Sequence, residues 1–279
     1  MAKIIDGKEF AKAFDEKLIN KIENLYLKGI MPTIGILRVG ENPGDLAYER
    51  GAVNKANKLG IKVEKYICEN DISMEDLIAV IKSINENDEI HGLLMLRPLP
   101  PHIDEDLVRN QLDLRKDLDC ITDLSLANVF TGAEGGFPPC TAEACIELLK
   151  YYNIEIAGKN CLVIGRSTVI GKPVAMMLLK ENGTVTICHS RTPKDMLIEM
   201  CKKADIVIVA AGKRAIFTKE MAHKNQVVID VGINVNDEGK LCGDVDYKEV
   251  EPIVAAITPV PGGVGSVTTS MLMSHLITE

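Results

Sequence analysis

The sequence lacks the features that mark membrane proteins and nucleic-acid-binding proteins. No apolar run approaches the roughly 18 residues that a membrane-spanning helix needs. The first residues, MAKIIDGKEFAKAF, alternate charged with apolar side chains and lack the apolar core of a signal peptide. The net charge of −8 argues against nucleic acid or an anionic membrane as the main partner. We therefore expect a cytoplasmic protein with no membrane partner and no nucleic-acid partner.

The eight cysteines lack the spacing of a metal site. They are Cys68, Cys120, Cys140, Cys145, Cys161, Cys188, Cys201 and Cys242. None forms a C-x2-C pair, and none has a histidine partner at zinc-finger spacing. Cys161 and Cys188 lie inside apolar, strand-like runs, where a thiol behaves as a small hydrophobic side chain. We predict reduced, buried cysteines and no metal.

The sequence also lacks internal repeats and low-complexity segments, and its composition is that of a globular protein. It is 46% hydrophobic and 26% charged, which argues against disorder. A length of 279 residues is enough for two domains of ordinary size.

In the first half, helical patterns alternate with short apolar runs. The predicted helices span 8–27, 42–59 and 73–85, and the predicted strands span 32–40, 61–67 and 90–96. Ser73 and Asp76 resemble a capping box at the start of the third helix. Strands separated by helices imply a parallel sheet that is covered on both faces. The segment RPLPP (97–101) must leave this sheet, and we predict that it forms a pocket wall at the carboxyl end of its strand.

The second half repeats the alternation after a stretch with a weaker pattern. We predict a connector at 121–139 and a helix at 141–152. Further predicted strands span 184–189, 205–211, 226–232 and 251–258, with shorter helices between them. The fold class is therefore α/β, with two doubly wound lobes, the second of the Rossmann type.

The stretch from Cys161 to Leu179 has the order of a phosphate-binding site: an apolar strand, a glycine turn and a helix. The first N–H groups of a helix have no partner within the helix, and the helix dipole adds positive charge there. Gly165 and Gly171 leave room for a phosphate against the backbone. The spacing is Gly-x5-Gly rather than G-x-G-x-x-G, with Ser167 where a second glycine would stand, so an ordinary glycine turn is the alternative.

The residues after the next strand favour NADP over NAD. An NAD site usually has an Asp or Glu at this point, about 20 residues past the glycine turn, which binds the ribose 2′-hydroxyl. Here the strand ends in His189, Ser190, Arg191 and Thr192, with no carboxylate. Hydroxyl and guanidinium donors suit a 2′-phosphate, and Arg166 adds a second cation. The alternative is that Arg191 is a solvated loop residue.

Six motifs then identify a family by resemblance. GRSTVIGKP, TVTICHSRT, ADIVIVAAGK, VIDVGIN, GDVD and TPVPGGVG occur in the order found in the bifunctional methylenetetrahydrofolate dehydrogenase/cyclohydrolases. The first half adds ILRVG, an equivalent of the family's Pro-Leu-Pro turn, KDLD and PCT, so the resemblance covers essentially the whole chain. It implies a catalytic folate lobe at 1–120 completed by a C-terminal helix at 264–279, and an NADP lobe at 140–258. It also implies a folate cleft between the lobes and a homodimer.

The resemblance and the patterns above together give the candidate site residues. The cofactor residues are Gly165, Arg166, Ser167, Gly171, Ser190, Arg191, Gly212 and Ile233. The substrate residues are Tyr48, Leu96, Pro98, Leu99, Asp119, Pro261, Gly262 and Gly263. The candidate catalytic residues are Tyr48, Asp119 and, as a substitute base, Lys55. From the residues alone, a core position is the preferred interpretation of Tyr48, and Asp119 could cap a turn. The family pattern favours binding of the pterin by the Asp119 carboxylate.

The sequence departs from the family where hydrolysis is catalysed. The family has Tyr-x-x-x-Lys on the second helix, and the lysine position is Ala52 here. The family's glutamine before the L-P-L-P turn is Leu96, and Arg97 follows it. Lys55 lies seven residues after Tyr48 on the same helix face. Cys120, Ser125 and Ser266 replace a glycine, an asparagine and a proline of the family.

These departures affect the two half-reactions unequally. Oxidation of 5,10-methylenetetrahydrofolate needs hydride departure to NADP but no base, whereas opening the methenyl ring needs general acid–base catalysis. The hypothesis is that dehydrogenase activity is kept and cyclohydrolase activity is weak, unless Lys55 or Arg97 takes over. Two alternatives are a non-catalytic paralogue that binds NADP or folate, and an NADP dehydrogenase of another small substrate.

Overall fold

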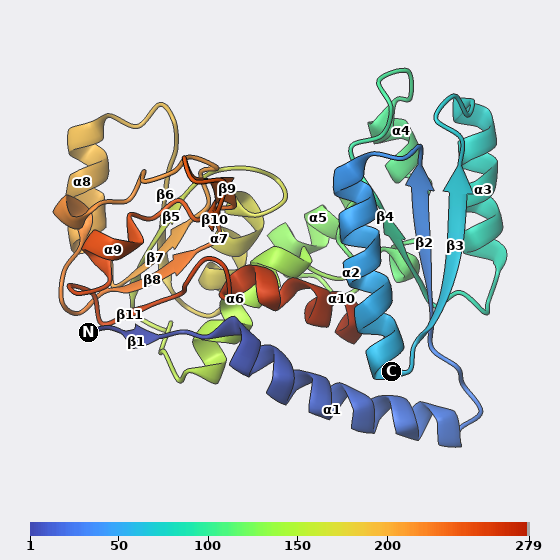
Figure 1. Cartoon of the computed structure of the whole chain (residues 1–279), viewed down its shortest axis with the longest axis horizontal. Coiled ribbons are helices and arrows are strands. Elements are labelled where there is room, and N and C mark those ends of the chain that lie inside the picture. The colour runs from blue at the N-terminus through green and yellow to red at the C-terminus, as the bar shows by residue number, and fades with distance from the viewer. Residues whose placement is uncertain (278–279) are drawn as a thin grey trace. The chain divides into compact units, whose positions relative to one another are not determined.

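The computed structural model describes residues 1–277, and its contacts divide this chain into two compact units. Unit 1 contains residues 1–12 and 141–268, and unit 2 contains residues 13–140 and the C-terminal segment from Thr269. The predicted boundary differs at the N-terminus. Strand β1 (Lys3–Ile4) pairs in parallel with β11 (Ala256–Ile257), so the first residues belong to the sheet of unit 1 (Figure 1).

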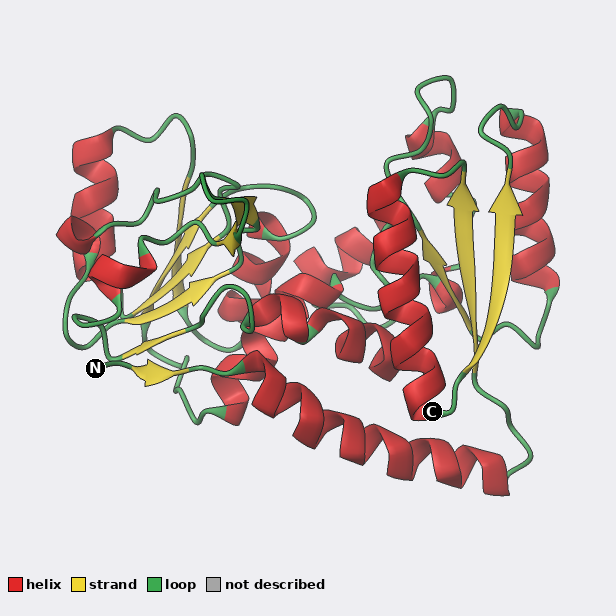
Figure 2. Ribbon diagram, in the orientation of Figure 1, coloured by secondary structure: helices red, strands yellow, loops and turns green. Residues whose placement is uncertain are grey.

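Unit 2 is built on a parallel sheet of three strands in the order β3–β2–β4. The strands are β2 (Thr33–Val39), β3 (Lys62–Cys68) and β4 (Gly92–Met95), and the helices between them are α2 (Pro43–Leu59) and α3 (Met74–Glu86). The chain moves from β2 to one neighbour and then crosses to the other side of β2 (Figure 2). Right-handed crossovers in opposite directions place the two helices on opposite faces of the sheet.

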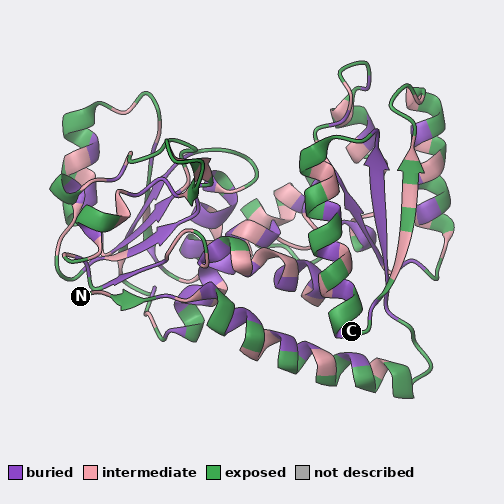
Figure 3. Cartoon of the chain, viewed as in Figure 1, coloured by how far each residue is buried: buried purple, intermediate pink, exposed green. Residues whose placement is uncertain are grey.

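Side chains of β2 confirm that the sheet is covered on both faces. Leu37 packs in one hydrophobic cluster with Leu77 and Ile81 of α3. The next residue along the strand, Arg38, faces the other way and forms an ion pair of 2.8 Å with Glu49 of α2. All seven residues of β2 are buried, whereas β3 at the sheet edge alternates between exposed and partly buried residues (Figure 3).

The helix ends in unit 2 follow the local signals in the sequence. The Asn42 side chain accepts a hydrogen bond from Gly44 N at the start of α2, and Gly60, with φ 83°, ends that helix. Ser73 Oγ accepts a hydrogen bond from Asp76 N at 3.0 Å, which confirms the predicted cap of α3. The remaining elements that belong wholly to unit 2 are α4 (Glu105–Arg109), the 3-10 turn η1 (Leu114–Lys116) and α5 (Asp123–Thr131).

Helix α5 occupies the segment that the sequence predicted as a connector. Thr122 Oγ1 accepts a hydrogen bond from Ser125 N at 3.1 Å and so caps the helix, and Gly132, with φ 72°, ends it. The helix has only nine residues and one of them, Ser125, is buried, so it gives little hydrophobic periodicity to detect.

Unit 1 contains a parallel sheet of six strands in the order β1–β11–β8–β7–β5–β6. Its other strands are β5 (Asn160–Ile164), β6 (Thr184–Cys188), β7 (Ile206–Val209) and β8 (Val227–Asp230). Helix α7 (Gly171–Lys180) connects β5 to β6, and α8 (Lys194–Lys203) connects β6 to β7. The direction of winding reverses between β5 and β7, which is where open α/β sheets bind ligands at the carboxyl ends of the strands.

The last predicted strand of unit 1 is shorter than expected. Residues 251–258 were predicted as a strand, but only Ala256 and Ile257 form one, as β11. The preceding helix α9 (Tyr247–Val250) continues into a turn at 251–253, and Pro252 has no N–H to donate to a ladder. A small antiparallel hairpin, β9 (Asn234–Val235) and β10 (Leu241–Cys242), was not predicted.

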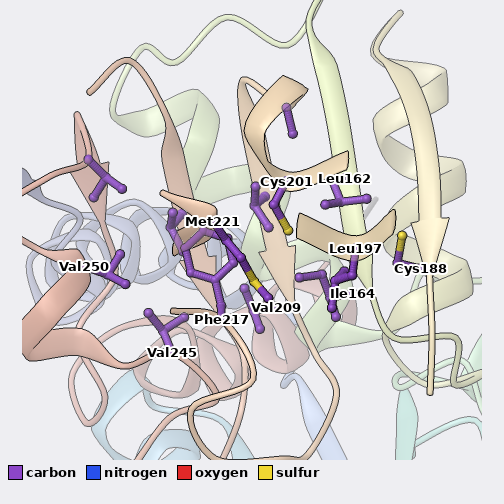
Figure 4. Close-up of a cluster of buried hydrophobic side chains, with 14 of the residues drawn as sticks. Leu162, Ile164, Cys188, Leu197, Cys201, Val209, Phe217, Met221, Val245 and Val250 are labelled. Atoms are coloured by element: carbon purple, nitrogen blue, oxygen red, sulfur yellow. The ribbon is translucent and has the colours of Figure 1, made fainter. Parts of the chain in front are cut away.

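One hydrophobic cluster of unit 1 joins its sheet to α8 and α9. Figure 4 shows Phe217 beside Met221 and Val209 in this buried cluster. The elements not yet named are α1 (Gly7–Leu27), α6 (Cys140–Tyr151), η2 (Lys219–Met221), η3 (Val264–Ser266) and α10 (Thr268–Leu276). In residues 1–277, no helix is both long enough and apolar enough to span a membrane. The eight cysteines have free thiols, and six of them are buried.

Candidate functional site

A cavity of about 1020 Å³ lies in unit 1 at the carboxyl ends of β5 and β7. Four of the predicted cofactor residues line it: Gly165, Arg166, Ser167 and Ser190. Gly171, Arg191, Gly212 and Ile233 do not. Lysines that the sequence analysis did not single out also line it, among them Lys194, Lys213 and Lys219.

The glycine turn after β5 is packed against the end of β7. Gly165 has φ +138°, and a Cβ atom on it would lie 2.1 Å from the carbonyl oxygen of Ala210. A Cβ atom on Gly171 would lie 2.5 Å from the carbonyl oxygen of Gly165. Both positions therefore require glycine, and the backbone of the turn forms the floor between β5 and β7.

Ser167 changes which N–H groups of this turn are free. Its Oγ accepts hydrogen bonds from Ile170 N (3.1 Å) and Gly171 N (3.4 Å), and its carbonyl accepts one from Lys172 N (2.9 Å). The first donors of α7, which the sequence suggested as the phosphate site, are thus used within the turn. The backbone N–H groups of 166–169 have no acceptor within the described chain. An anion would meet these earlier donors.

The loop after β6 is tightly folded and contains no carboxylate. His189 N donates to Thr192 Oγ1 at 2.9 Å, and Arg191 N donates to His189 Nδ1 at 3.1 Å. The second bond requires an unprotonated Nδ1, so it fixes the tautomer of His189. The loop presents Ser190 and Lys194 to the cavity, while Arg191 is exposed outside it.

In unit 2, Tyr48, Asp119 and Cys140 form a second candidate site. Tyr48 on α2 is 37% exposed as a residue, and burial of its phenol together with the negative charge of Asp119 raises the phenol pKa. Asp119 accepts a hydrogen bond from Cys140 N at 3.2 Å. Burial raises the pKa of the Asp119 carboxyl, and its hydrogen bonds with Cys140 oppose the shift. The predicted pair Tyr48 and Asp119 therefore interact electrostatically.

The other residues of the KDLD motif support the fold around Asp119. Lys116 is buried and donates to the carbonyl oxygens of Ile84, Asn85 and Asn87 at 2.6–3.0 Å, at the C-terminal end of α3. An ammonium group is favourable there because carbonyl groups at a helix end lack partners and carry negative charge. Asp117 is fully buried and accepts bonds from Ile121 N and from Thr122. The chain is thus fixed at Lys116 and Asp117, directly before Leu118 and Asp119.

The family's lysine position is apolar and fully buried here. Ala52 has no exposed surface. Lys55, one turn further on, has its Nζ 2.8 Å from Asp15 Oδ2 and 3.0 Å from Ser270 Oγ. The side chains of Lys55 and Asp15 are only 15% and 4% exposed, so this is an interior ion pair.

The family's glutamine position, directly after β4, is also apolar and buried. Leu96 and Leu99 are buried, and Leu99 belongs to the hydrophobic cluster of unit 2, whereas Pro98 is exposed. Arg97 is held by Glu105, whose carboxylate accepts a bond from the guanidinium at 2.9 Å and another from Leu99 N at 2.9 Å. Of this predicted pocket wall (97–101), Pro98 and Pro101 are exposed, Arg97 and Pro100 are half-buried, and Leu99 is buried.

The remaining predicted substrate residues belong to unit 1. The turn at Pro261, Gly262 and Gly263 packs on Gly7, whose N–H donates to the carbonyl of Gly262 at 2.8 Å. A Cβ atom on Gly7 would lie 2.0 Å from the carbonyl oxygen of Gly263. The predicted substrate residues are therefore divided between the two units. No group of three or more metal-ligating side chains occurs among residues 1–277.

Comparisons with known proteins agree along the whole chain. Residues 5–119 match the family model of the tetrahydrofolate dehydrogenase/cyclohydrolase catalytic domain, and residues 139–279 match that of its NAD(P)-binding domain. The chain is 47% identical over 277 residues to the bifunctional protein FolD of Clostridium botulinum, covering 99% of this chain and 98% of that protein.

Solved structures show the same similarity. The bifunctional FolD enzyme of Campylobacter jejuni superposes with a TM-score of 0.96 at 36% identity, covering 99% of this chain and 98% of that one. The FolD of Trypanosoma brucei, solved with NADP cofactor and an inhibitor, has a TM-score of 0.91 at 33% identity, covering 99% and 96%.

Proposed function

Because the chain belongs to the tetrahydrofolate dehydrogenase/cyclohydrolase family, we propose that it oxidises 5,10-methylenetetrahydrofolate to 5,10-methenyltetrahydrofolate with NADP. The observation that carries the proposal is the cavity at the winding reversal of unit 1, with a glycine turn as its floor and no acid after β6. We also propose that the protein is a cytoplasmic homodimer, as the resemblance to the family implies.

The residues of this cavity fit a dinucleotide that carries a 2′-phosphate. Gly165 lets the turn pack directly against the end of β7, because a Cβ atom there would meet the Ala210 carbonyl, and the turn then lines the cavity. The N–H groups of 166–169 would bind oxygens of the pyrophosphate. Ser190, in the loop after β6, and Lys194, the first residue of α8, would bind the 2′-phosphate, where a carboxylate would repel it. Arg166 supplies further positive charge. The bound nucleotide supplies a hydride acceptor.

The oxidation requires little general acid–base catalysis by the protein. Hydride departure leaves a cation that is delocalised over two nitrogen atoms, so no proton has to be removed. The protein must chiefly hold the substrate in a reactive orientation. We assign this holding to Tyr48 and Asp119, because a carboxylate matches the two parallel N–H donors of an aminopyrimidine edge. The raised pKa of Tyr48 keeps its phenol protonated at neutral pH.

Hydrolysis of the methenyl product is proposed to be weak. Water must be deprotonated and a leaving amine protonated, which is worth roughly 10²–10⁴ in rate when side chains do it. The family's lysine and glutamine are replaced by Ala52 and Leu96, which are 0% and 4% exposed and carry no proton to transfer. The two candidate substitutes are engaged elsewhere: Lys55 with Asp15, and Arg97 with Glu105.

Two assays on the purified protein test the proposal. NADPH formation from methylenetetrahydrofolate should be substrate-dependent, while methenyl decay should stay near its spontaneous rate. Absence of NADPH formation, with NADP still raising the melting temperature, would instead indicate the non-catalytic paralogue. NADPH formation with other small substrates only would indicate a different dehydrogenase. Methenyl hydrolysis far above the spontaneous rate would overturn the proposed loss of cyclohydrolase activity.

A gain-of-function variant sharpens the second assay. The double substitution Ala52→Lys with Leu96→Gln restores both family side chains, and we expect it to raise methenyl hydrolysis by about tenfold or more. Gly51→Ala is the matched control on the same helix, because a Cβ atom there has no neighbour within 4 Å. It should leave hydrolysis unchanged.

A further inference from the structure

Two carboxylates are buried at the ends of β7 and β8 with no basic partner among the described residues. Asp230 is 2% exposed and Asp244 is 0% exposed. Neither forms an ion pair in residues 1–277. Their acceptor oxygens are used by backbone N–H groups instead. Burying two carboxylates without a basic partner costs free energy. We therefore expect this pair to do more than fill space.

Asp244 holds both ends of one loop. Its Oδ2 accepts hydrogen bonds from Ala211 N (2.7 Å) and Gly212 N (2.8 Å), directly after β7. Its backbone carbonyl accepts one from Ile216 N at 2.8 Å. The loop 211–216 therefore begins and ends on the same residue. Four of its members, Ala211, Lys213, Ala215 and Ile216, line the cavity of unit 1.

Asp230 in turn fixes Asp244. Its Oδ1 accepts bonds from Asp244 N (2.9 Å) and Gly232 N (3.0 Å), and its Oδ2 accepts one from Val245 N (3.0 Å). The other oxygen of Asp244 accepts a bond from Asn234 Nδ2 at 2.8 Å. Five backbone N–H groups and one amide thus converge on two carboxylates.

Each carboxylate also faces a glycine. A Cβ atom on Gly232 would lie 2.2 Å from Cγ of Asp244, and one on Gly243 would lie 1.8 Å from Oδ2 of Asp230. No side chain fits at either position. The motifs VIDVGIN and GDVD therefore pack together, and the aspartate of each motif lies against the glycine of the other.

We propose that Asp244, held by Asp230, is a positioning residue that sets the shape of the nucleotide cavity by fixing both ends of loop 211–216. The identity of the ligand as NADP rests on the proposed function. The loop geometry does not.

The test compares Asp244→Ala with Asp244→Asn in the full-length protein. Alanine leaves Ala211 N and Gly212 N without an acceptor, and we expect the Kd and the KM for NADP to rise about tenfold. The kcat at saturating NADP and the KM for the folate should change little. Asparagine at 244 keeps one side-chain oxygen, which accepts from both N–H groups. Its NH2 group replaces the other oxygen, and the side-chain amide of Asn234 rotates so that its own oxygen accepts from that NH2 group. NADP binding should therefore be largely restored.

Glu238→Gln is the matched control, because Glu238 lies on the adjoining hairpin, its side chain is 71% exposed and it pairs with Lys240, which lies outside loop 211–216. It should bind NADP as the wild type does. Equal Kd values for wild type and Asp244→Ala would overturn the positioning role while leaving the proposed function intact. A wild type with no affinity for NADP would count against the proposed function instead.

A second measurement covers the case in which Asp244→Ala does not fold. Amide hydrogens of Ala211, Gly212 and Ile216 should exchange slowly in the nucleotide-free wild type and in Asp244→Asn, because their acceptors belong to the protein. Fast exchange of these three amides in the nucleotide-free wild type would refute the role of Asp244.

Discussion

Replacing Lys55 by methionine separates a structural role of this residue from a catalytic one. Methionine fills a similar volume but removes the ammonium group that lies 2.8 Å from Asp15 Oδ2. If the contacts of Lys55 describe its role, the substitution lowers the stability of the protein and leaves both half-reactions unchanged. If Lys55 substitutes for the family's lysine, hydrolysis falls instead.

The magnitude follows from the surroundings of Asp15. Removing one partner of a buried ion pair costs about 3–5 kcal/mol, because the other charge is left without compensation. Asp15 keeps Ser270 Oγ at 2.9 Å and Lys58 Nζ at 3.4 Å in this case. We therefore expect the free energy of unfolding to fall by about 2–3 kcal/mol, at or just below the lower end of that range.

Lys58→Met is the matched control. Lys58 approaches the same carboxylate, but its side chain is 64% exposed. Exposed pairs contribute about 0–1 kcal/mol, so this variant should be nearly as stable as the wild type. The double variant Asp15→Asn with Lys55→Met removes the buried charge as well, and should recover part of the loss.

The assay is urea unfolding followed by circular dichroism, with NADPH formation and methenyl decay measured well below the transition. Loss of methenyl hydrolysis in Lys55→Met, with stability unchanged, would refute the reasoning and establish Lys55 as the substitute base. A destabilisation as small as that of Lys58→Met would show that the pair is not interior in solution.

Three further predictions concern the cavity, pH and the KDLD motif. Gly165→Ala should weaken NADP binding by about tenfold or more, measured by calorimetry, because its Cβ atom would meet the Ala210 carbonyl at 2.1 Å and φ is +138°; unchanged affinity would contradict the floor described for the cavity. Burial raises the pKa of Asp230 from 3.8 to about 6. Since the folded-state pKa is the higher one, its contribution to stability is full below pH 3.8 and is lost as the pH rises through 6, by up to about 3 kcal/mol. The stability of the wild type relative to Asp230→Asn should fall over this window in urea titrations, and a constant difference would contradict it. Lys116→Met should lower the free energy of unfolding by about 1–3 kcal/mol, because three carbonyl groups at the end of α3 lose their donor; Lys82→Met on the exposed side of α3 serves as the control and should be neutral.

Local signals predicted the elements that carry the site. The cap at Ser73, the helix end at Gly60 and the glycine turn at Gly165 depend on residues within a few positions of each other, so one sequence suffices to detect them. Short or weakly periodic elements were missed or predicted with wrong bounds. Helix α5, with nine residues of which one is buried, and the two-residue strands β9 and β10 were missed, and β11 forms only two of the residues predicted as a strand at 251–258.

The lining of the candidate nucleotide cavity could be predicted only in part. Four of the predicted cofactor residues, Gly165, Arg166, Ser167 and Ser190, line the cavity, and their binding of a nucleotide stays a prediction. Lys194 and Lys213 line it as well, but a lysine in a polar loop has no signature that distinguishes it from a solvated side chain. The sequence predicted free N–H groups in the first turn of α7, whereas in the structure the free N–H groups are those of 166–169. The Ser167 hydroxyl accepts from the start of the helix, and this depends on a side-chain rotamer that the sequence does not specify.

The sequence by itself determined the α/β class, the position of the glycine turn, the missing acid after β6 and the family, because each depends on periodicity or on residue order along a short stretch. The tertiary structure decided which distant residues meet. It brought β1 to β11, Lys55 to Asp15 and Ser270, and Asp244 to the loop after β7. These contacts join residues that lie from about thirty to more than two hundred positions apart, and no local pattern encodes them. The sequence shows only that the family's lysine is absent at Ala52. The structure adds that Lys55, the candidate substitute, forms an ion pair with Asp15.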